Sequence, residues 1–182
     1  MSEDRAGIKG DMYMGNIAKF ELVSREQFIG DAENAFDINE KEADEMYRAL
    51  KLPKRATVGS AGYDFFTPVD LEIEAGKSIL IPTGIRVRMD AGWVLLLFPR
   101  SGLGFKYRFQ LDNSVGVIDQ DYYNAKNEGH IMARMTNDSR EGKTLSIKAG
   151  QAFMQGVFVP FGTAEEEEVT TKRTDGFGST TG

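Results

Sequence analysis

Residues 69–98 read VDLEIEAGKSILIPTGIRVRMDAGWVLLLF, and this stretch decides the fold. Apolar residues alternate with polar ones and then run together, in segments at residues 69–73, 79–81, 85–89 and 93–98. The segments are separated by turn residues at 75–76, 82–84 and 91–92. Alternation with period two is typical of β-strands that have one buried face, and glycine and proline are typical of the turns between them. We therefore expect short strands joined by tight turns.

The same pattern continues towards the carboxyl end. Further apolar segments lie at residues 131–135, 145–147 and 153–160, and a possible first strand lies at 17–23. Strands at this regular spacing, without helices between them, indicate an antiparallel sandwich or barrel. We expect an all-β fold.

One segment in the first third departs from this pattern. Residues 24–36 show no clear period and are interpreted as a loop, whereas residues 37–50 predict a helix, with Asp37 capping and Glu40 three residues later. Acidic residues crowd its start, basic residues lie near its end, and Pro53 stops it. We interpret this helix as an insertion that packs on the domain or on a neighbouring subunit.

Composition limits the classes of function. The 182 residues are 41% hydrophobic, enough for one domain with a core, and the net charge of −6 argues against general binding to nucleic-acid backbones. With no cysteine and the single His130, any metal is expected to be a hard cation bound by oxygen. The chain shows neither a signal peptide nor an apolar run long enough to span a membrane, so we expect a cytoplasmic protein.

Both ends of the chain differ from the centre. Residues 1–16 are expected to form an amino-terminal arm, residues 17–162 the β-domain with its helical insertion at about 37–51, and residues 163–182 a flexible tail. The tail contains four consecutive glutamates and ends in a stretch rich in glycine, serine and threonine. Phe177, framed by glycines and following Arg173, favours a lid that closes on a base and its phosphates, although an inert tail fits the same composition.

Residues 116–123, GVIDQDYY, are the leading candidate for chemistry. An apolar run with a single acid, ending in two tyrosines, could bury a flat ring while Asp119 activates a water molecule. The same stretch is also typical of a strand end with a solvated aspartate and two half-buried tyrosines.

Three other stretches carry weaker signals. The turn at residues 99–104, PRSGLG, could bind a phosphate through Arg100, Ser101 and backbone N–H groups, or could be a plain surface turn. Asp64 could orient water on a metal or cap a turn, and Gln155 could reach a ligand or a partner across the sheet.

Taken together, five segments resemble the motifs of the trimeric dUTP diphosphatase (dUTPase) family. In order they are AGYD, PRSGLG, NSVGVIDQDYY, GQAFMQGVFVP and the carboxyl-terminal R-to-GFGST stretch, spread over residues 61–182. The resemblance implies a jelly-roll-like β-barrel that assembles as a homotrimer with shared active sites. It implies hydrolysis of dUTP to dUMP and pyrophosphate with Mg²⁺, which keeps uracil out of DNA.

The resemblance also implies a role for each matching residue. Asp119 matches the acid that activates the attacking water, and Asp64 an acid that holds waters of Mg²⁺. The residues that match contacts to the uracil and deoxyribose are Asn113, Gly116, Ile118, Tyr122 and Phe177. The residues that match contacts to the phosphates are Arg100, Ser101, Gly102, Gln155, Arg173, Gly178 and Ser179.

The chain departs from the family pattern in three places. The hairpin after Tyr122 is longer, reading YYNAKNEGHI over residues 122–131, a form typical of Gram-positive bacteria and their phages. We expect residues 123–129 to form a lengthened tip beside the pocket. The tail has one residue fewer between Arg173 and Phe177 than the usual motif, and the inserted helix has no counterpart in it.

Two alternatives remain open. A dCTP deaminase shares the fold, but it would need a base that reaches cytosine, and we find no matching glutamate in the pocket segments. A nucleotide-gated binding protein could instead use the inserted helix or the long hairpin to dock a regulatory partner.

Overall fold

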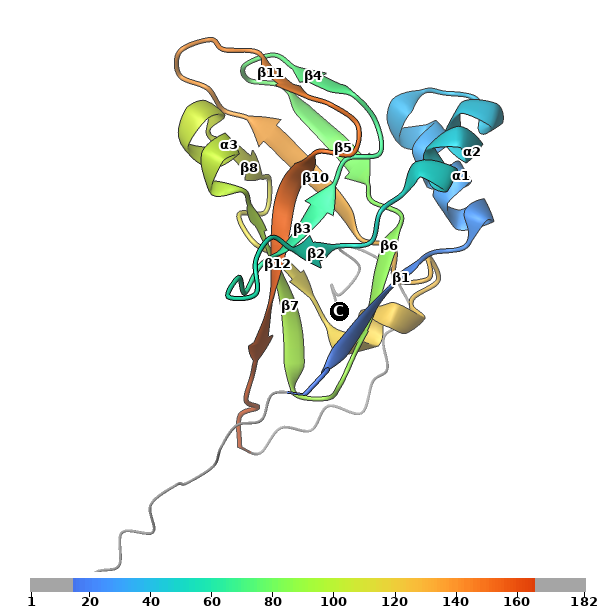
Figure 1. The fold of residues 1–182 in the computed structure, drawn as a ribbon, viewed down its shortest axis with the longest axis vertical. Helices are drawn as coiled ribbons and strands as arrows, with labels where there is room; N and C mark the ends of the chain where they lie inside the picture. The colour runs from blue at the N-terminus through green and yellow to red at the C-terminus, as the bar shows by residue number, and fades with distance from the viewer. Residues whose placement is uncertain (1–14, 166–182) are drawn as a thin grey trace, which may run out of the picture.

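The computed structural model describes residues 15–165, which form a mostly β fold with three α-helices and one 3₁₀ helix (Figure 1). The helices are α1 (Arg25–Phe36), α2 (Glu40–Ala49), α3 (Ser101–Tyr107) and η1 (Gln120–Asn124). The strands are β1 (Ala18–Leu22), β2 (Lys54–Arg55), β3 (Tyr63–Phe66), β4 (Leu71–Ile73), β5 (Ser78–Pro82), β6 (Ile85–Met89), β7 (Trp93–Pro99), β8 (Phe109–Leu111), β9 (Gly116–Ile118), β10 (Met132–Asn137), β11 (Leu145–Ile147) and β12 (Ala152–Pro160). Each strand segment expected from the alternating pattern is confirmed.

The strands form four antiparallel sheets. The largest has the order β2-β3-β12-β7-β9, and a second has the order β5-β10-β8. Two pairs, β1-β6 and β11-β4, complete the set. Strands distant in sequence pair with one another, as β12 does with both β3 and β7, so the topology brings the separate motif segments together.

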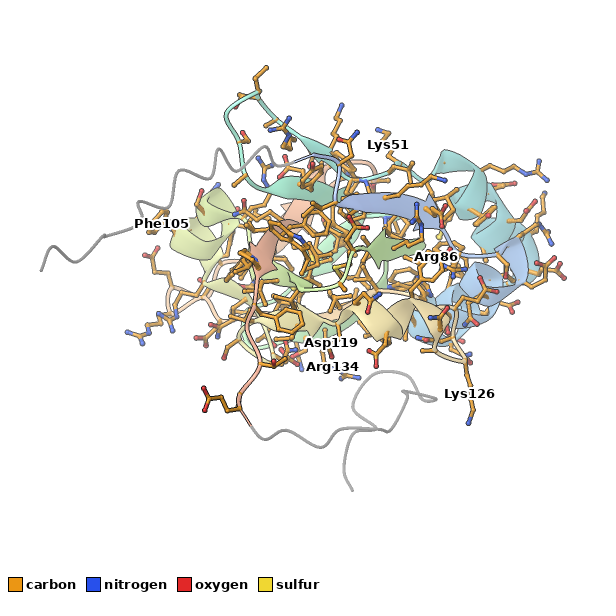
Figure 2. The ribbon with its side chains drawn as sticks, turned by 90° about the horizontal axis from the view of Figure 1, so that it is seen from below. Lys51, Arg86, Phe105, Asp119, Lys126 and Arg134 are labelled. Atoms are coloured by element: carbon orange, nitrogen blue, oxygen red, sulfur yellow. The ribbon has the colours of Figure 1, made fainter. Side chains whose placement is uncertain are left out.

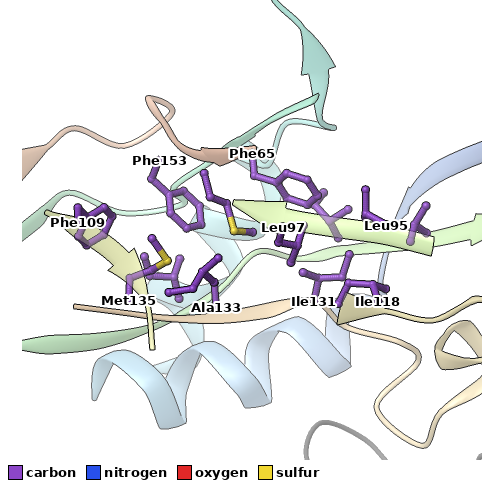
Figure 3. Close-up of a cluster of buried hydrophobic side chains, with 14 of the residues drawn as sticks. Phe65, Leu95, Leu97, Phe109, Ile118, Ile131, Ala133, Met135 and Phe153 are labelled. Carbon is purple, nitrogen blue, oxygen red and sulfur yellow. The ribbon is translucent and has the colours of Figure 1, made fainter. Parts of the chain in front are cut away.

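The core lies between these sheets, where Phe65, Leu97, Met135 and Phe153 are buried (Figure 3). Packing is tight at Gly156 of β12. A Cβ atom there would lie 2.8 Å from Leu95 Cδ1, so only glycine allows β12 to lie this close to its neighbours.

The expectation of a loop at residues 24–36 is wrong, because most of this stretch forms α1. Ser24 caps the helix, since its Oγ accepts a hydrogen bond from the backbone N–H of Gln27 at 3.1 Å. Phe28, Ile29 and Ala32 are the residues that α1 buries. The apolar stripe is narrow and the rest of the helix is polar, which explains why no helical period stands out in the sequence.

The helix expected at residues 37–50 is present as α2, but its predicted cap is wrong. Asp37 instead ends α1 in a left-handed conformation with φ 54°. Asn39 caps α2: its side chain accepts from Glu42 N–H, and the Glu42 carboxylate accepts from Asn39 N–H, both at 3.1 Å. This reciprocal capping box begins α2 at Glu40.

The two helices form a unit with its own small core of Val23, Phe28, Ile29, Ala32 and Ala43. In Figure 1 the pair lies at one side of the strands, nearest β5 and β6. Within residues 15–165, the helices fall short of the length and apolar character needed to cross a membrane.

Candidate active site

Five of the expected site residues line one cavity of about 740 Å³, which we call the hairpin cavity. They are Asn113, Gly116, Ile118, Asp119 and Tyr122. The loop from β8 to β9, strand β9 and helix η1 supply these residues, and β5 and β10 supply much of the remaining wall. These five residues lie within ten positions of one another in the sequence, and the structure places them around one cavity.

Asp119 lies at the junction of β9 and η1. Its backbone is extended (φ −76°, ψ 157°), and its C=O accepts from Tyr122 N–H at 3.2 Å, which begins the 3₁₀ turn. The side chain is half-buried and does not cap η1. The carboxylate is thus held at the end of a strand, at the wall of the cavity.

Tyr122 forms a fixed wall. Its side chain is 1% exposed, and its hydroxyl donates to the C=O of His130 at 2.8 Å. The Nδ2 of Asn127 donates to the same hydroxyl at 2.8 Å. Hydrogen bonds in both directions leave the ring little freedom to turn.

The loop before β9 is tightly folded around Asn113. Ser114 has φ 66°, its N–H donates to Leu111 O at 2.9 Å, and Val115 N–H donates to Asn113 O at 2.7 Å. At Gly116 a Cβ atom would lie 3.0 Å from Leu97 side-chain carbons, so a larger residue here would require Leu97 to shift. The exposed side-chain amide of Asn113 is therefore presented from a rigid turn.

A second cavity of about 660 Å³, here called the phosphate-turn cavity, is lined by Asp64, Arg100, Ser101 and Gly102. Arg100 Nε lies 3.2 Å from Asp64 Oδ1, which joins β3 to the end of β7. The stretch at residues 99–104 is only partly the turn expected from sequence, because a short helix, α3, already begins at Ser101. Ser101 and Gly102 are exposed at its first turn.

Gln155 lies on β12 between Asp64 of β3 and Phe98 of β7. Its Nε2 donates to the C=O of Pro99 at 3.3 Å, directly before Arg100. The Gln155 side chain therefore contacts the backbone of the turn at residues 99–104.

Residues 123–129, expected as a lengthened hairpin tip beside the pocket, are not among the residues that line the hairpin cavity. The guanidinium carbon of Arg86 lies 3.6 Å from the ring centroid of Tyr123, and Tyr123 Oη donates to Glu21 at 2.6 Å. The hydrogen bond to Glu21, with burial, raises the pKa of Tyr123. Tyr123 therefore ties the tip to β1 and β6, whereas its neighbour Tyr122 faces the cavity.

No group of three or more His, Cys, Asp or Glu side chains suited to a metal ion occurs between residues 15 and 165. Asp64, beside Arg100, is the one expected metal-site acid in the phosphate-turn cavity. A single carboxylate fits an ion that keeps its waters and is held mainly by a ligand, as Mg²⁺ commonly is. The expected tail residues Arg173, Phe177, Gly178 and Ser179 lie outside the described residues.

The sequence did not single out Arg134, which lines the hairpin cavity from β10. Figure 2 shows Arg134 beside Asp119. Alternation along β10 could have indicated that Arg134 and Met132 share the face opposite to the buried Ala133 and Met135. Only the pairing of β10 with β5 and β8 places that face at the cavity.

Comparison with known proteins agrees with this geometry. The family model described as dUTPase matches residues 48–181. The deoxyuridine 5'-triphosphate nucleotidohydrolase of Lactococcus lactis is 45% identical in an alignment of 134 residues that covers 72% of this chain and 88% of that protein. The corresponding protein of Haemophilus ducreyi is 40% identical in an alignment of 139 residues that covers 72% of this chain and 87% of that protein.

Solved structures show the same fold. The crystal structure of dUTPase from Streptococcus mutans has a TM-score of 0.59 and 40% identity, covering 80% of this chain and 98% of that chain. A mutant dUTPase from phage phi11 of S. aureus, described as coordinating a structural Mg(II) ion, is alike in fold, with a TM-score of 0.58 and 22% identity over 86% of this chain and 98% of that one. From the gathered motif residues, the family match and these relatives, we conclude that the chain belongs to the dUTPase family.

Proposed function

We propose that this protein hydrolyses dUTP at the α-phosphorus to give dUMP and pyrophosphate. The observation that carries the proposal is the hairpin cavity, which the Asp119 carboxylate, the Asn113 amide and the fixed Tyr122 ring line together. The relative of this chain from Lactococcus lactis, which is 45% identical, is named for this activity. The reaction keeps uracil out of DNA and supplies dUMP.

Asp119 is the proposed general base. It accepts a hydrogen bond from a water molecule and takes its proton as the water oxygen bonds to the α-phosphorus. The bond from the α-phosphorus to the bridging oxygen breaks, and pyrophosphate leaves with the bond electrons. The backbone of Asp119 is fixed at the junction of β9 and η1, which supports a defined position for its carboxylate.

The same cavity is proposed to select the nucleoside. The Asn113 amide, with backbone groups near Gly116 and Ile118, hydrogen-bonds the uracil edge. Tyr122 packs beneath the deoxyribose and leaves no room for a 2′-hydroxyl. The two hydrogen bonds to the Tyr122 hydroxyl support this role, because a sterically selective wall has to be rigid.

The phosphate-turn cavity is proposed to hold the triphosphate. Arg100 and Ser101 contact phosphate oxygens, and Gly102 allows the phosphates to approach the backbone closely. Gln155 supports the turn by donating a hydrogen bond to the C=O of Pro99. Asp64 would bind waters of Mg²⁺, and the bound ion would offset the negative charge that develops on the leaving group.

The two cavities share no lining residue among those described. The resemblance to the trimeric family implies that one nucleotide occupies the hairpin cavity of one copy of the chain and the phosphate-turn cavity of another. We therefore propose a homotrimeric, jelly-roll-like β-barrel assembly with three shared active sites. The tail residues Arg173, Phe177, Gly178 and Ser179 would close over the nucleotide as a lid.

The decisive experiment measures pyrophosphate release from dUTP, UTP, dTTP and dCTP, with and without Mg²⁺, alongside the mass in solution. We expect hydrolysis of dUTP far faster than of the others, dependence on Mg²⁺, and the mass of a trimer. Hydrolysis of UTP as fast as dUTP would overturn the proposal, and ammonia released from dCTP would favour the deaminase. A regulatory partner at the helical unit or the hairpin stays a prediction, tested by pull-down with and without α1 and α2.

A further inference from the structure

His130 links α1 to the wall of the hairpin cavity. Its side chain is fully buried, and Gly84 N–H donates to its Nε2 at 2.7 Å. A ring nitrogen that accepts a hydrogen bond carries no proton, so in the neutral ring the proton is on Nδ1. That N–H donates to Asp31 Oδ2 of α1 at 2.5 Å. The Gly84 N–H therefore fixes the tautomer of the neutral ring, and the protonated Nδ1 points to Asp31 of α1.

The main chain of His130 holds the selective ring. Its C=O accepts the hydrogen bond from the Tyr122 hydroxyl at 2.8 Å, and Asn127, which donates to that hydroxyl, lies on the same hairpin. Two hydrogen bonds therefore connect Asp31 to the cavity wall. One joins Asp31 to the His130 ring, and the other joins the His130 carbonyl to the Tyr122 hydroxyl.

The hairpin packs closely against Tyr122 at Gly129, which couples the position of the hairpin to that of Tyr122. Gly129 has φ 72°, and a Cβ atom there would lie 2.7 Å from Tyr122 O and 2.8 Å from Tyr123 Cα. Gly129 therefore packs directly against the backbone of Tyr122 and Tyr123.

A second link runs from the beginning of α1. Glu128 Oε2, at the tip of the hairpin, accepts from the backbone N–H of Ser24, the N-cap of α1, at 2.7 Å. Helix α1 therefore holds the hairpin at two points, Ser24 and Asp31. In Figure 1 the loop that follows η1 reaches the helical pair beside β6.

The Asp31 carboxylate is suited to a fixed link. Burial alone would raise its pKa, but hydrogen bonds from His130 and Gln27 hold the pKa below its ordinary value. Gln27 Nε2 donates to Asp31 Oδ2 at 2.8 Å, which keeps the carboxylate oriented along the helix towards His130.

We propose that Asp31, with Glu128 as a second contact, is a positioning residue for nucleoside selection: the helical unit fixes Tyr122 through the His130 hairpin. The inference rests on the proposed function, since it assumes that Tyr122 packs against deoxyribose. It extends that function to Asp31, which lies outside the family match that begins at residue 48.

The test compares Asp31→Ala with the matched control Asp44→Ala. Asp44, on α2, is as shielded as Asp31, with side-chain exposures of 14% and 20%, and it accepts from Arg25 Nε at 2.6 Å. Both changes remove a hydrogen-bonded carboxylate from the helical unit. Of the two aspartates, Asp31 has the recorded hydrogen bond to the hairpin.

In Asp31→Ala we expect the KM for dUTP to rise about fivefold or more and the preference for dUTP over UTP to fall by a similar factor, since a buried partner is removed. The kcat should change less, because Asp119 is untouched. Asp31→Asn retains an oxygen that accepts from His130 and should restore most of the KM. Asp44→Ala should lower the melting temperature without changing KM or preference.

Wild-type KM and preference in Asp31→Ala, or the same losses in Asp44→Ala, would overturn the inference. If Asp31→Ala does not fold, Glu128→Ala serves instead, since that side chain is 32% exposed; wild-type kinetics there would also overturn it. A wild-type enzyme that fails to prefer dUTP would instead overturn the proposed function, so the two failures are distinguishable.

Discussion

Arg100 Nε and Asp64 Oδ1 lie 3.2 Å apart, which joins the turn after β7 to the neighbouring part of the five-stranded sheet. The two side chains come from motifs separated by 36 positions in the chain, and they line the same cavity. A cation and an anion held together can bind a phosphate and a hydrated metal ion side by side.

Replacing Arg100 should weaken the interaction with the triphosphate of dUTP. We expect Arg100→Gln to lower kcat/KM for dUTP by about 10- to 100-fold, because a hydrogen bond to a charged group contributes about 1.5–3 kcal/mol. The matched control is Arg108→Gln, since Arg108 pairs with Asp138 at 2.9 Å on the exposed surface. Equal losses in the two variants would contradict a specific role for Arg100.

Removing the proposed base should abolish most of the activity without unfolding the protein. Asp119→Asn should lower kcat by about 100-fold or more, as expected for loss of general-base catalysis. Its melting temperature should stay close to that of the wild type, because the side chain is half-buried and does not cap η1. The exposed neighbour Asp121 supplies the control, and Asp121→Asn should retain activity.

Gly129 should tolerate no side chain. In Gly129→Ala the added Cβ meets the backbone of Tyr122 and Tyr123 at a positive φ, so we expect a loss of about 2–4 kcal/mol in the free energy of unfolding. Gly142 has φ 69° with nothing within 4 Å of a Cβ atom. Gly142→Ala should therefore cost only about 1 kcal/mol, the backbone penalty alone. Urea unfolding of both variants measures the difference.

The capping assignment of α2 is testable. Asn39→Ala should lower the free energy of unfolding by about 1 kcal/mol, since it removes one half of the capping box. Asp37→Gly should be neutral within about 0.5 kcal/mol, because Asp37 already has the left-handed conformation that glycine favours. A larger loss from Asp37→Gly than from Asn39→Ala would restore Asp37 as the cap.

Asp31 should make stability depend on pH in the acid range. Its folded-state pKa lies below the ordinary value of 3.8, so its contribution is present above that pH and is lost as pH falls through the lower, folded-state value. We expect urea midpoints of wild type and Asp31→Asn to differ near neutral pH and to converge as the pH falls below the folded-state pKa of Asp31. A constant difference throughout would contradict the linkage.

Strand positions followed from the sequence because alternation with period two is a local property. Each apolar segment between residues 69 and 98 shows by its alternation which residues face the core. Strands β4 to β7 lie at the positions predicted from these segments. The sequence shows no helical period for α1 because its buried stripe is narrow, consisting of Phe28, Ile29 and Ala32. The cap of α2 was misplaced because Asp37 and Asn39 both begin a plausible capping pair, and only backbone geometry separates them.

By itself, the sequence determined the mostly β fold, the family and the motif residues, since short-range pattern and residue chemistry carry that information. Tertiary structure decided which residues meet. It placed Asn113, Asp119 and Tyr122 in one cavity and Asp64 with Arg100 in another, because strand pairing joins segments far apart in the chain. It alone showed that α1 reaches Tyr122 through His130. One hydrogen bond of this connection joins residues 99 positions apart, Asp31 and His130, and the other lies within the hairpin.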